Sequence, residues 1–288
     1  RKAEQATAKL AVDWDKARSH WAYQPVRKPA VPTVKNAQGW VKTDVDKFVL
    51  AKLEPKGMQP SKQADRRTLA RRASYTLIGL PPEISDVEDF VNDPAPDAFQ
   101  KLVDKYLDSP HYGERWTRHW MDVARYADTT GDRANRRQPN YPYAWTYRNW
   151  LIEAFNKDLP YDQFIVQQIA ADRLELGDDF KTLAALGFLT VGKQFMGQIN
   201  EVIDDRIDVV TQGFMGMTVA CARCHDHKFD PIPTKDYYSL HGVFSSTQEP
   251  ELGPILSLPK DRKLFAEYLE AVEKLEDEIR QVRIKEEF

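Results

Sequence analysis

The chain has 288 residues, of which 42 % are hydrophobic and 30 % are charged, and its formal net charge is −3. This apolar content suffices for a buried core and argues against a disordered chain. The small net charge argues against nucleic acid as a partner, since nucleic-acid-binding proteins usually carry a basic excess. No apolar run approaches the roughly 18 residues that a membrane-spanning helix requires, so we expect no membrane span.

The amino-acid composition of the chain changes near residue 20. Residues 1–19 are polar and compatible with helix, and we interpret them as an N-terminal helical extension. The prolines from Pro25 to Pro32 favour an extended path that lies over a surface. No signal peptide is recognisable at the start of the sequence, so the chain is either cytoplasmic or a mature form whose signal has been removed.

Helical signals dominate between residues 43 and 220. Ser109 and Pro110 form a typical helix start, because a capping hydroxyl precedes a proline at the first helical position. The stretches 129–142 and 192–200 contain turn-forming residues and are expected to be loops. Few segments alternate as strands do, so the expected fold is mostly α, an irregular multi-helix domain with long loops. We predict helices at 43–57, 65–79, 85–91, 97–108, 110–128, 144–157, 161–171, 180–190 and 203–220.

Residues 260–288 carry a regular apolar repeat. Apolar residues recur at spacings of four and three, and the positions between them are mainly Glu, Lys and Arg. This pattern is typical of a coiled-coil helix, although a single helix packed back on the domain would show the same spacing. The apolar positions are Leu264, Tyr268, Val272, Leu275, Ile279 and Val282.

The two cysteines of the chain, Cys221 and Cys224, are followed at once by His225. A c-type haem needs two thiols to bond to its two vinyl groups and an adjacent histidine to bind the iron. Cys-x-x-Cys-His supplies all three in five residues. The pattern therefore indicates a single covalent haem c, with His225 as the proximal iron ligand.

Two other chemistries are open to the same residues. A structural zinc site would combine both cysteines with two of His225, His227 and His241. A redox-active or structural disulfide would join the two cysteines. A closed zinc site usually has a second well-spaced ligand pair, and a thioredoxin-like disulfide usually follows a strand. The sequence has neither feature, so haem attachment is favoured.

The segment from Cys221 to Pro233 resembles the signature of the planctomycetal cytochrome-c-like family. The similarity continues through four earlier blocks and covers about residues 20–247. The blocks are His20–Pro25, Asp65–Leu69 with Gly79–Pro82, Ser109–Trp116 with His119–Asp128, and Trp145–Asp162.

The resemblance implies a haem c domain, which we place at residues 20–250. Members of the family are usually large secreted bacterial proteins, so it also implies a periplasmic or otherwise extracytoplasmic location. A second domain of unknown function usually follows the haem c domain. We therefore expect residues 251–288, with the helix at 260–288, to lead into such a domain or to contact it on another chain.

The iron ligand opposite His225 is left open by the sequence. His119 is the first candidate, because it would share a polar helix face with Arg115 and Asp122. Asp122 or a backbone carbonyl oxygen would orient the imidazole. A methionine ligand would have to come from an earlier element, since all five methionines precede the motif. Another histidine, or no protein ligand at all, are the remaining possibilities.

His227 cannot reach the far side of the iron. It lies two residues beyond His225, which is a reach of at most about 7 Å. We expect it at the haem edge, near a propionate, or in a hydrogen bond at the surface. The propionates themselves require cationic partners, and Arg125, Arg148 and Arg223 are candidates because each lies beside aromatic residues or in the motif.

These residues predict an electron-transfer protein that meets a redox partner protein. A second hypothesis is a haem enzyme with an open iron position, in which the loop at 129–142 lines the site of a substrate such as a carbohydrate. A third is an interaction module stabilised by zinc. The sequence leaves open whether the protein is an enzyme.

Overall fold

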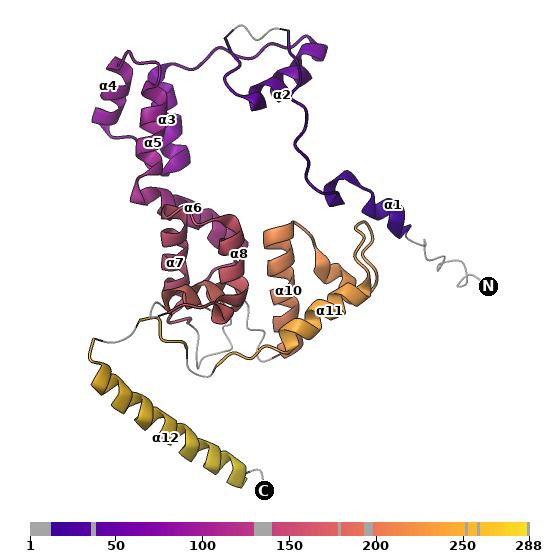
Figure 1. Cartoon of the computed structure of the whole chain (residues 1–288), viewed down its shortest axis with the longest axis vertical. Coiled ribbons are helices and arrows are strands. Elements are labelled where there is room, and N and C mark those ends of the chain that lie inside the picture. Colours follow the sequence, from indigo (N-terminus) through magenta and orange to yellow (C-terminus); the bar gives the residue numbers. More distant parts are fainter. Residues whose placement is uncertain are drawn as a thin grey trace, which may run out of the picture. The chain divides into compact units, whose positions relative to one another are not determined.

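The computed structural model describes residues 13–35, 39–129, 140–177, 180–192, 198–250, 253–257 and 260–286. These residues are mostly α-helical, which confirms the expected fold class (Figure 1). Within them, the one β pairing is an isolated antiparallel bridge between Thr129 and Asn140. Most of the predicted loop at 129–142 lies outside the described residues, as does the greater part of the predicted extension at 1–19.

The chain divides into two compact units. The first comprises Arg1–Leu107 and Cys221–Asp236, and the second comprises Asp108–Ala220 and Tyr237–Phe288. The cysteine segment therefore belongs to the same unit as the first third of the chain. The predicted limits of the haem c domain, 20–250, and of its flanking segments stay predictions.

The first unit consists of short helices joined by extended segments. Residues 25–34 have no regular structure, in agreement with the proline-rich sequence. The helices are α1 (Trp14–Arg18), α2 (Asp44–Leu53), α3 (Arg66–Leu77), α4 (Ile84–Asn92) and α5 (Ala98–Leu107), with the 3-10 turns η1 (Trp21–Tyr23) and η2 (Glu54–Lys56).

Helices α3, α4 and α5 share a small core. Asp65 caps α3 by accepting a hydrogen bond from the Thr68 backbone N–H at 2.9 Å, and this bond lowers the pKa of the Asp65 carboxyl. The three helices then bury an apolar cluster between them. Its members are Ala70, Ala73, Phe90, Ala98, Leu102 and Tyr106.

The second unit contains the longer helices. Most predicted helices are confirmed to within a few residues, but α10 starts and ends earlier than expected and α11 was not predicted. The elements are α6 (Pro110–Val123), α7 (Ala144–Asn156), α8 (Tyr161–Ala170), η3 (Ala171–Arg173), η4 (Phe180–Leu186), α9 (Gly187–Thr190), α10 (Ile199–Met215), α11 (Thr234–Ser245) and α12 (Arg262–Glu286). The turn η6 (Val219–Arg223) and α11 each continue across a boundary between the two units.

Helix α6 ends at Val123, although the sequence predicted it to continue to about residue 128. Arg125 adopts a left-handed backbone conformation with φ 48°, which a helix cannot contain. Its guanidinium pairs with Asp205 and its Nη1 donates to the Phe188 carbonyl oxygen at 3.1 Å. These tertiary bonds stop the helix, and they could not be seen from the local sequence.

Helices α6 and α7 approach each other closely at Gly113. A Cβ atom there would lie 2.5 Å from the Ile152 carbonyl oxygen, so only glycine fits. The Gly113 backbone N–H donates to Asn156 Oδ1 at 2.8 Å, and Asn156 Nδ2 donates to the Pro110 carbonyl oxygen at 3.1 Å. This close crossing fixes how α6 packs on α7.

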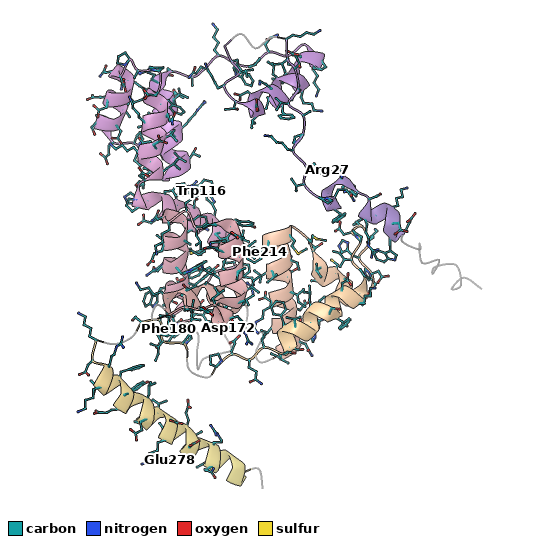
Figure 2. All side chains as sticks on the ribbon, viewed as in Figure 1. Arg27, Trp116, Asp172, Phe180, Phe214 and Glu278 are labelled. Atoms are coloured by element: carbon teal, nitrogen blue, oxygen red, sulfur yellow. The ribbon has the colours of Figure 1, made fainter. Side chains whose placement is uncertain are left out.

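The core of the second unit is aromatic and includes one buried amide. Trp120, Phe188 and Phe214 form a cluster, with ring centroids 4.9 Å apart between the two phenylalanines; Figure 2 labels Phe214. Gln168 is fully buried, and its Oε1 accepts hydrogen bonds from Trp120 Nε1 at 2.8 Å and from the Tyr147 hydroxyl at 2.7 Å. Every buried donor in this small network therefore has a partner.

Helix α12 is the longest helix among the described residues (Figure 1). It confirms the predicted helix near the end of the sequence, whereas the prediction that it forms a coiled coil is untested. Neither α12 nor any other helix in the described part of the chain has the length and apolar character needed to cross a membrane.

Candidate cofactor attachment site

The cysteine segment follows α10 and forms a short helical turn. Gly216 ends α10 in a left-handed conformation, and the turn η6 begins at Val219. The Cys221 and Cys224 thiols are free and both residues are exposed, while Ala222 between them is buried. The turn is thus anchored by its apolar residue and presents both sulfur atoms to solvent.

The imidazole of His225 is exposed and oriented. Its Nδ1 lies 2.7 Å from the Asp226 carbonyl oxygen. A carbonyl oxygen only accepts hydrogen bonds, so Nδ1 carries the proton and donates it. The lone pair of the imidazole is therefore on Nε2, which is the arrangement of a histidine that binds a metal through Nε2.

His227 is buried and holds the turn that follows His225. Its Nδ1 accepts hydrogen bonds from the backbone N–H groups of Asp230, at 2.8 Å, and Phe229, at 3.3 Å. The Asp230 carboxylate lies 3.3 Å from the same atom, but Nδ1 is an acceptor here, so that approach is not an ion pair. The His227 backbone N–H closes the turn by donating to the Ile232 carbonyl oxygen at 2.9 Å.

A tyrosine from the start of the chain is bonded to this turn. The Tyr23 hydroxyl donates to Asp230 Oδ1 at 2.8 Å, across 207 positions in the sequence. Partial burial, this hydrogen bond and the charge of Asp230 raise the pKa of the Tyr23 hydroxyl, so it stays a donor at neutral pH. The block at residues 20–25 is thereby tied to the cysteine segment.

Two large aromatic side chains of this region are strongly exposed. Trp21 and Phe229 each expose 80 % of their surface. Trp21 lies two residues before Tyr23, and Phe229 is adjacent to Asp230, so both flank the bonded pair. The Phe229 ring is contacted by Lys228, whose Nζ lies 5.0 Å from the ring centroid.

The side chains of the segment fit a covalently attached haem. Haem attachment requires two free accessible thiols and an accessible imidazole nitrogen, and residues 221–225 provide them. A zinc site would require a cluster of protein ligands. Within the described ranges, no group of three or more His, Cys, Asp or Glu side chains is placed to hold a metal ion.

The predicted distal ligand, His119, lies in the second unit on α6. It is exposed, and its ring centroid is 5.6 Å from that of Trp116. The Asp122 carboxylate, which was expected to orient the imidazole, accepts a hydrogen bond from Arg118. The role of His119 as an iron ligand stays a prediction.

The three arginines predicted to bind propionates lie in different surroundings. Arg125 is engaged by Asp205 and two backbone carbonyl oxygens, so most of its donors already have partners. Arg148 is partly buried on α7, and Arg223 is partly buried in η6 next to Cys224. The role of each in binding propionates stays a prediction.

Tyr126 lies within the electrostatic reach of Arg148. Its hydroxyl donates to Asp128 Oδ1 at 2.7 Å. Burial and this hydrogen bond raise the pKa of Tyr126 to about 12, against the opposing charge of Arg148. Tyr126 is therefore a neutral hydrogen-bond donor, and not a proton-transfer group, at physiological pH.

The fold and the site together define a mostly helical protein with an exposed Cys-x-x-Cys-His turn. The chain belongs to the PSCyt2 family, whose model carries the description "Protein of unknown function (DUF1549)" and matches residues 44–249. The match confirms the resemblance to the planctomycetal cytochrome-like family. No curated protein and no solved structure matches the chain.

Sequence reasoning missed the residues that hold the site in place. It expected His227 at a haem edge or at the surface, whereas the side chain is buried and binds backbone N–H groups. It attached no role to Tyr23 or Asp230. The available signal was that Asp230 lies in the segment that the family model matches, 44–249, while the resemblance of the block at 20–25, which contains Tyr23, stays a prediction.

Proposed function

We propose that this protein is an extracytoplasmic c-type cytochrome with one covalent haem that takes part in electron transfer. Cys221 and Cys224 carry the haem, and the Nε2 atom of His225 is the proximal iron ligand. The observation that carries the proposal is the state of these three side chains: two free exposed thiols beside an exposed imidazole whose Nδ1–H is bonded to a carbonyl oxygen.

Cys221 and Cys224 would each hold the haem through one thioether. Adding an S–H bond across a vinyl group changes no net oxidation state, so attachment would require no oxidant. When bound, haem supplies an iron that exchanges single electrons. The chain orients His225 through the Asp226 carbonyl and restricts the following turn through His227.

The expected location follows from this chemistry. Haem c is attached outside the cytoplasm, so we propose a periplasmic or otherwise extracytoplasmic protein. It would exchange electrons with a redox partner protein. A carbohydrate or other substrate, and a second domain or chain that meets residues 260–288, stay predictions.

The test is expression of the chain together with a haem c maturation system. We expect haem to remain with the polypeptide on a denaturing gel, together with the visible spectrum of haem bound through two thioethers. Replacing both cysteines, Cys221→Ser with Cys224→Ser, should abolish covalent haem. His241→Ala removes a histidine outside the motif and should leave attachment intact. A wild-type chain that matures without covalent haem contradicts the proposal.

The spectrum of the matured protein separates electron transfer from enzyme chemistry. A six-coordinate low-spin iron that does not bind carbon monoxide supports electron transfer. A high-spin iron that binds carbon monoxide supports the alternative of a haem enzyme with an open iron position. His119→Ala tests the distal ligand, since it should convert a low-spin spectrum to high spin if His119 binds the iron.

A further inference from the structure

Helix α12 exposes a continuous apolar stripe. Leu275, Ile279 and Val282 expose 57 %, 46 % and 55 % of their surfaces. The other positions of the helix are mainly charged, and Figure 2 labels one of its acidic residues, Glu278. Burying such a row of side chains removes apolar surface from water, which is favourable, so a partner surface is expected.

The stripe fits a seven-residue repeat. Three heptads place an apolar residue at every first (a) and fourth (d) position. The a positions hold Phe265, Val272 and Ile279, and the d positions hold Tyr268, Leu275 and Val282. A helix with this repeat is suited to pair with another helix of the same repeat.

The residue types favour a coiled coil of two helices. In parallel coiled coils, β-branched residues at a with leucine at d favour two helices. Val272 and Ile279 at a and Leu275 at d follow that rule, whereas the last d position holds Val282. We propose that α12 pairs with α12 of a second copy of this chain as a parallel two-stranded coiled coil. This proposal does not depend on haem binding.

Charge supports the same partner. In a parallel pair, the residue just before an a position (g) faces the residue just after the next d position (e) on the partner helix. Glu278 occupies such a g position and Arg283 the facing e position, so the sequence places opposite charges together twice in the dimer. The other facing pairs, Leu264 with Leu269 and Ala271 with Glu276, contain no like charges. In an antiparallel pair, Glu278 and Arg283 would not face each other.

The first experiment measures the molar mass of the 288-residue chain by analytical ultracentrifugation over a range of concentrations. We expect a dimer. The double variant Val272→Glu with Ile279→Glu places carboxylates in the interface and should be a monomer. Its far-UV circular dichroism spectrum should lose only the helical signal that α12 contributes. Glu270→Arg changes the charge of α12 at a position remote from the stripe and should remain a dimer.

The second experiment tests the direction of pairing by exchanging charges. Glu278→Arg and Arg283→Glu, made singly, each replace two attractive pairs by two repulsive pairs and should weaken the dimer about four- to thirtyfold. The double variant with both exchanges should recover the wild-type dissociation constant. Glu270→Arg again serves as the control.

The outcomes are distinct. A wild-type chain that stays monomeric at all concentrations overturns the proposal, and so does a dimer that survives the Val272→Glu with Ile279→Glu change. If the double variant with both charges exchanged does not regain the dissociation constant of the wild-type dimer, the parallel arrangement is overturned. Covalent haem attachment is measured separately, so its presence or absence does not affect these results.

Discussion

The cysteine segment of the first unit and the α6–α7 layer of the second are fixed by different kinds of interaction. The α6–α7 layer packs helix against helix around Gly113, where backbone atoms meet, and buries aromatic rings and Gln168. The cysteine segment leaves its thiols, His225 and Phe229 exposed and depends on hydrogen bonds that His227 Nδ1 and the Asp230 carboxylate accept.

This difference explains why the candidate site residues of the cysteine segment are accessible. A tightly packed layer tolerates little change because each added atom must displace backbone or a neighbouring ring. A turn held by a few hydrogen bonds keeps its backbone in place while the side chains of Cys221, Cys224 and His225 stay accessible to solvent. Substitutions in the layer should therefore act on overall stability, and substitutions in the turn should act on the local site.

The largest effect is expected at Gly113, where the α6–α7 layer is tightest. Gly113→Ala places a Cβ 2.5 Å from the Ile152 carbonyl oxygen and 2.6 Å from Asn156 Oδ1, so the two helices must move apart. We expect a loss of about 3 kcal/mol in the free energy of unfolding, measured by urea denaturation.

Gly242 provides the matched control, because it lies in α11 with no atom near its would-be Cβ. Gly242→Ala should be neutral or stabilise the protein by up to about 1 kcal/mol, since alanine is the better helix former. A Gly113→Ala protein as stable as the wild type would show that α6 and α7 are not tightly packed at Gly113.

The next effect is expected at His227, where the turn of the cysteine segment is held. His227→Ala leaves the backbone N–H groups of Phe229 and Asp230 without their acceptor, at a cost of about 1–3 kcal/mol. We expect faster amide hydrogen exchange at these two positions and, in the matured protein, a broadened haem spectrum.

His227→Asn is the control for this change. The asparagine Oδ1 occupies nearly the place of the histidine Nδ1 and can accept the same hydrogen bonds, whereas the longer glutamine cannot. His227→Asn should therefore restore slow exchange and His227→Gln should not. Slow exchange in the alanine variant would mean that His227 does not hold the turn.

The same contrast explains which features could be predicted from the sequence. Helices such as α3 carry their own start signal, because Asp65 caps the helix with a local hydrogen bond. The motif at residues 221–225 is local as well, since its three side chains lie within five residues, and its chemistry stays a prediction. These features need no knowledge of distant parts of the chain.

Features that depend on distant contacts were not predicted. Helix α6 ends early because Arg125 is held in a left-handed conformation by Asp205, 80 positions away. The position of His119 on the exposed side of α6, and the bond between Tyr23 and Asp230, likewise depend on how separate segments pack. A pattern of residues along one helix carries no information about such partners.

The smallest effect is expected at Tyr23, which ties residues 20–25 to the turn. Tyr23→Phe removes only the hydroxyl that donates to Asp230, and because the ring is partly exposed we expect a loss of about 0.5–1 kcal/mol at neutral pH. Partial burial and the Asp230 interaction raise the pKa of Tyr23 above its ordinary value of 10.0. In the unfolded chain the hydroxyl therefore ionises first, so the stability that it contributes is complete below pH 10 and declines at higher pH.

Urea denaturation of the wild-type and Tyr23→Phe proteins from neutral pH to above pH 10 should show the difference in stability at neutral pH and its decline above pH 10. A difference that is absent at neutral pH would mean that Tyr23 does not anchor the cysteine segment.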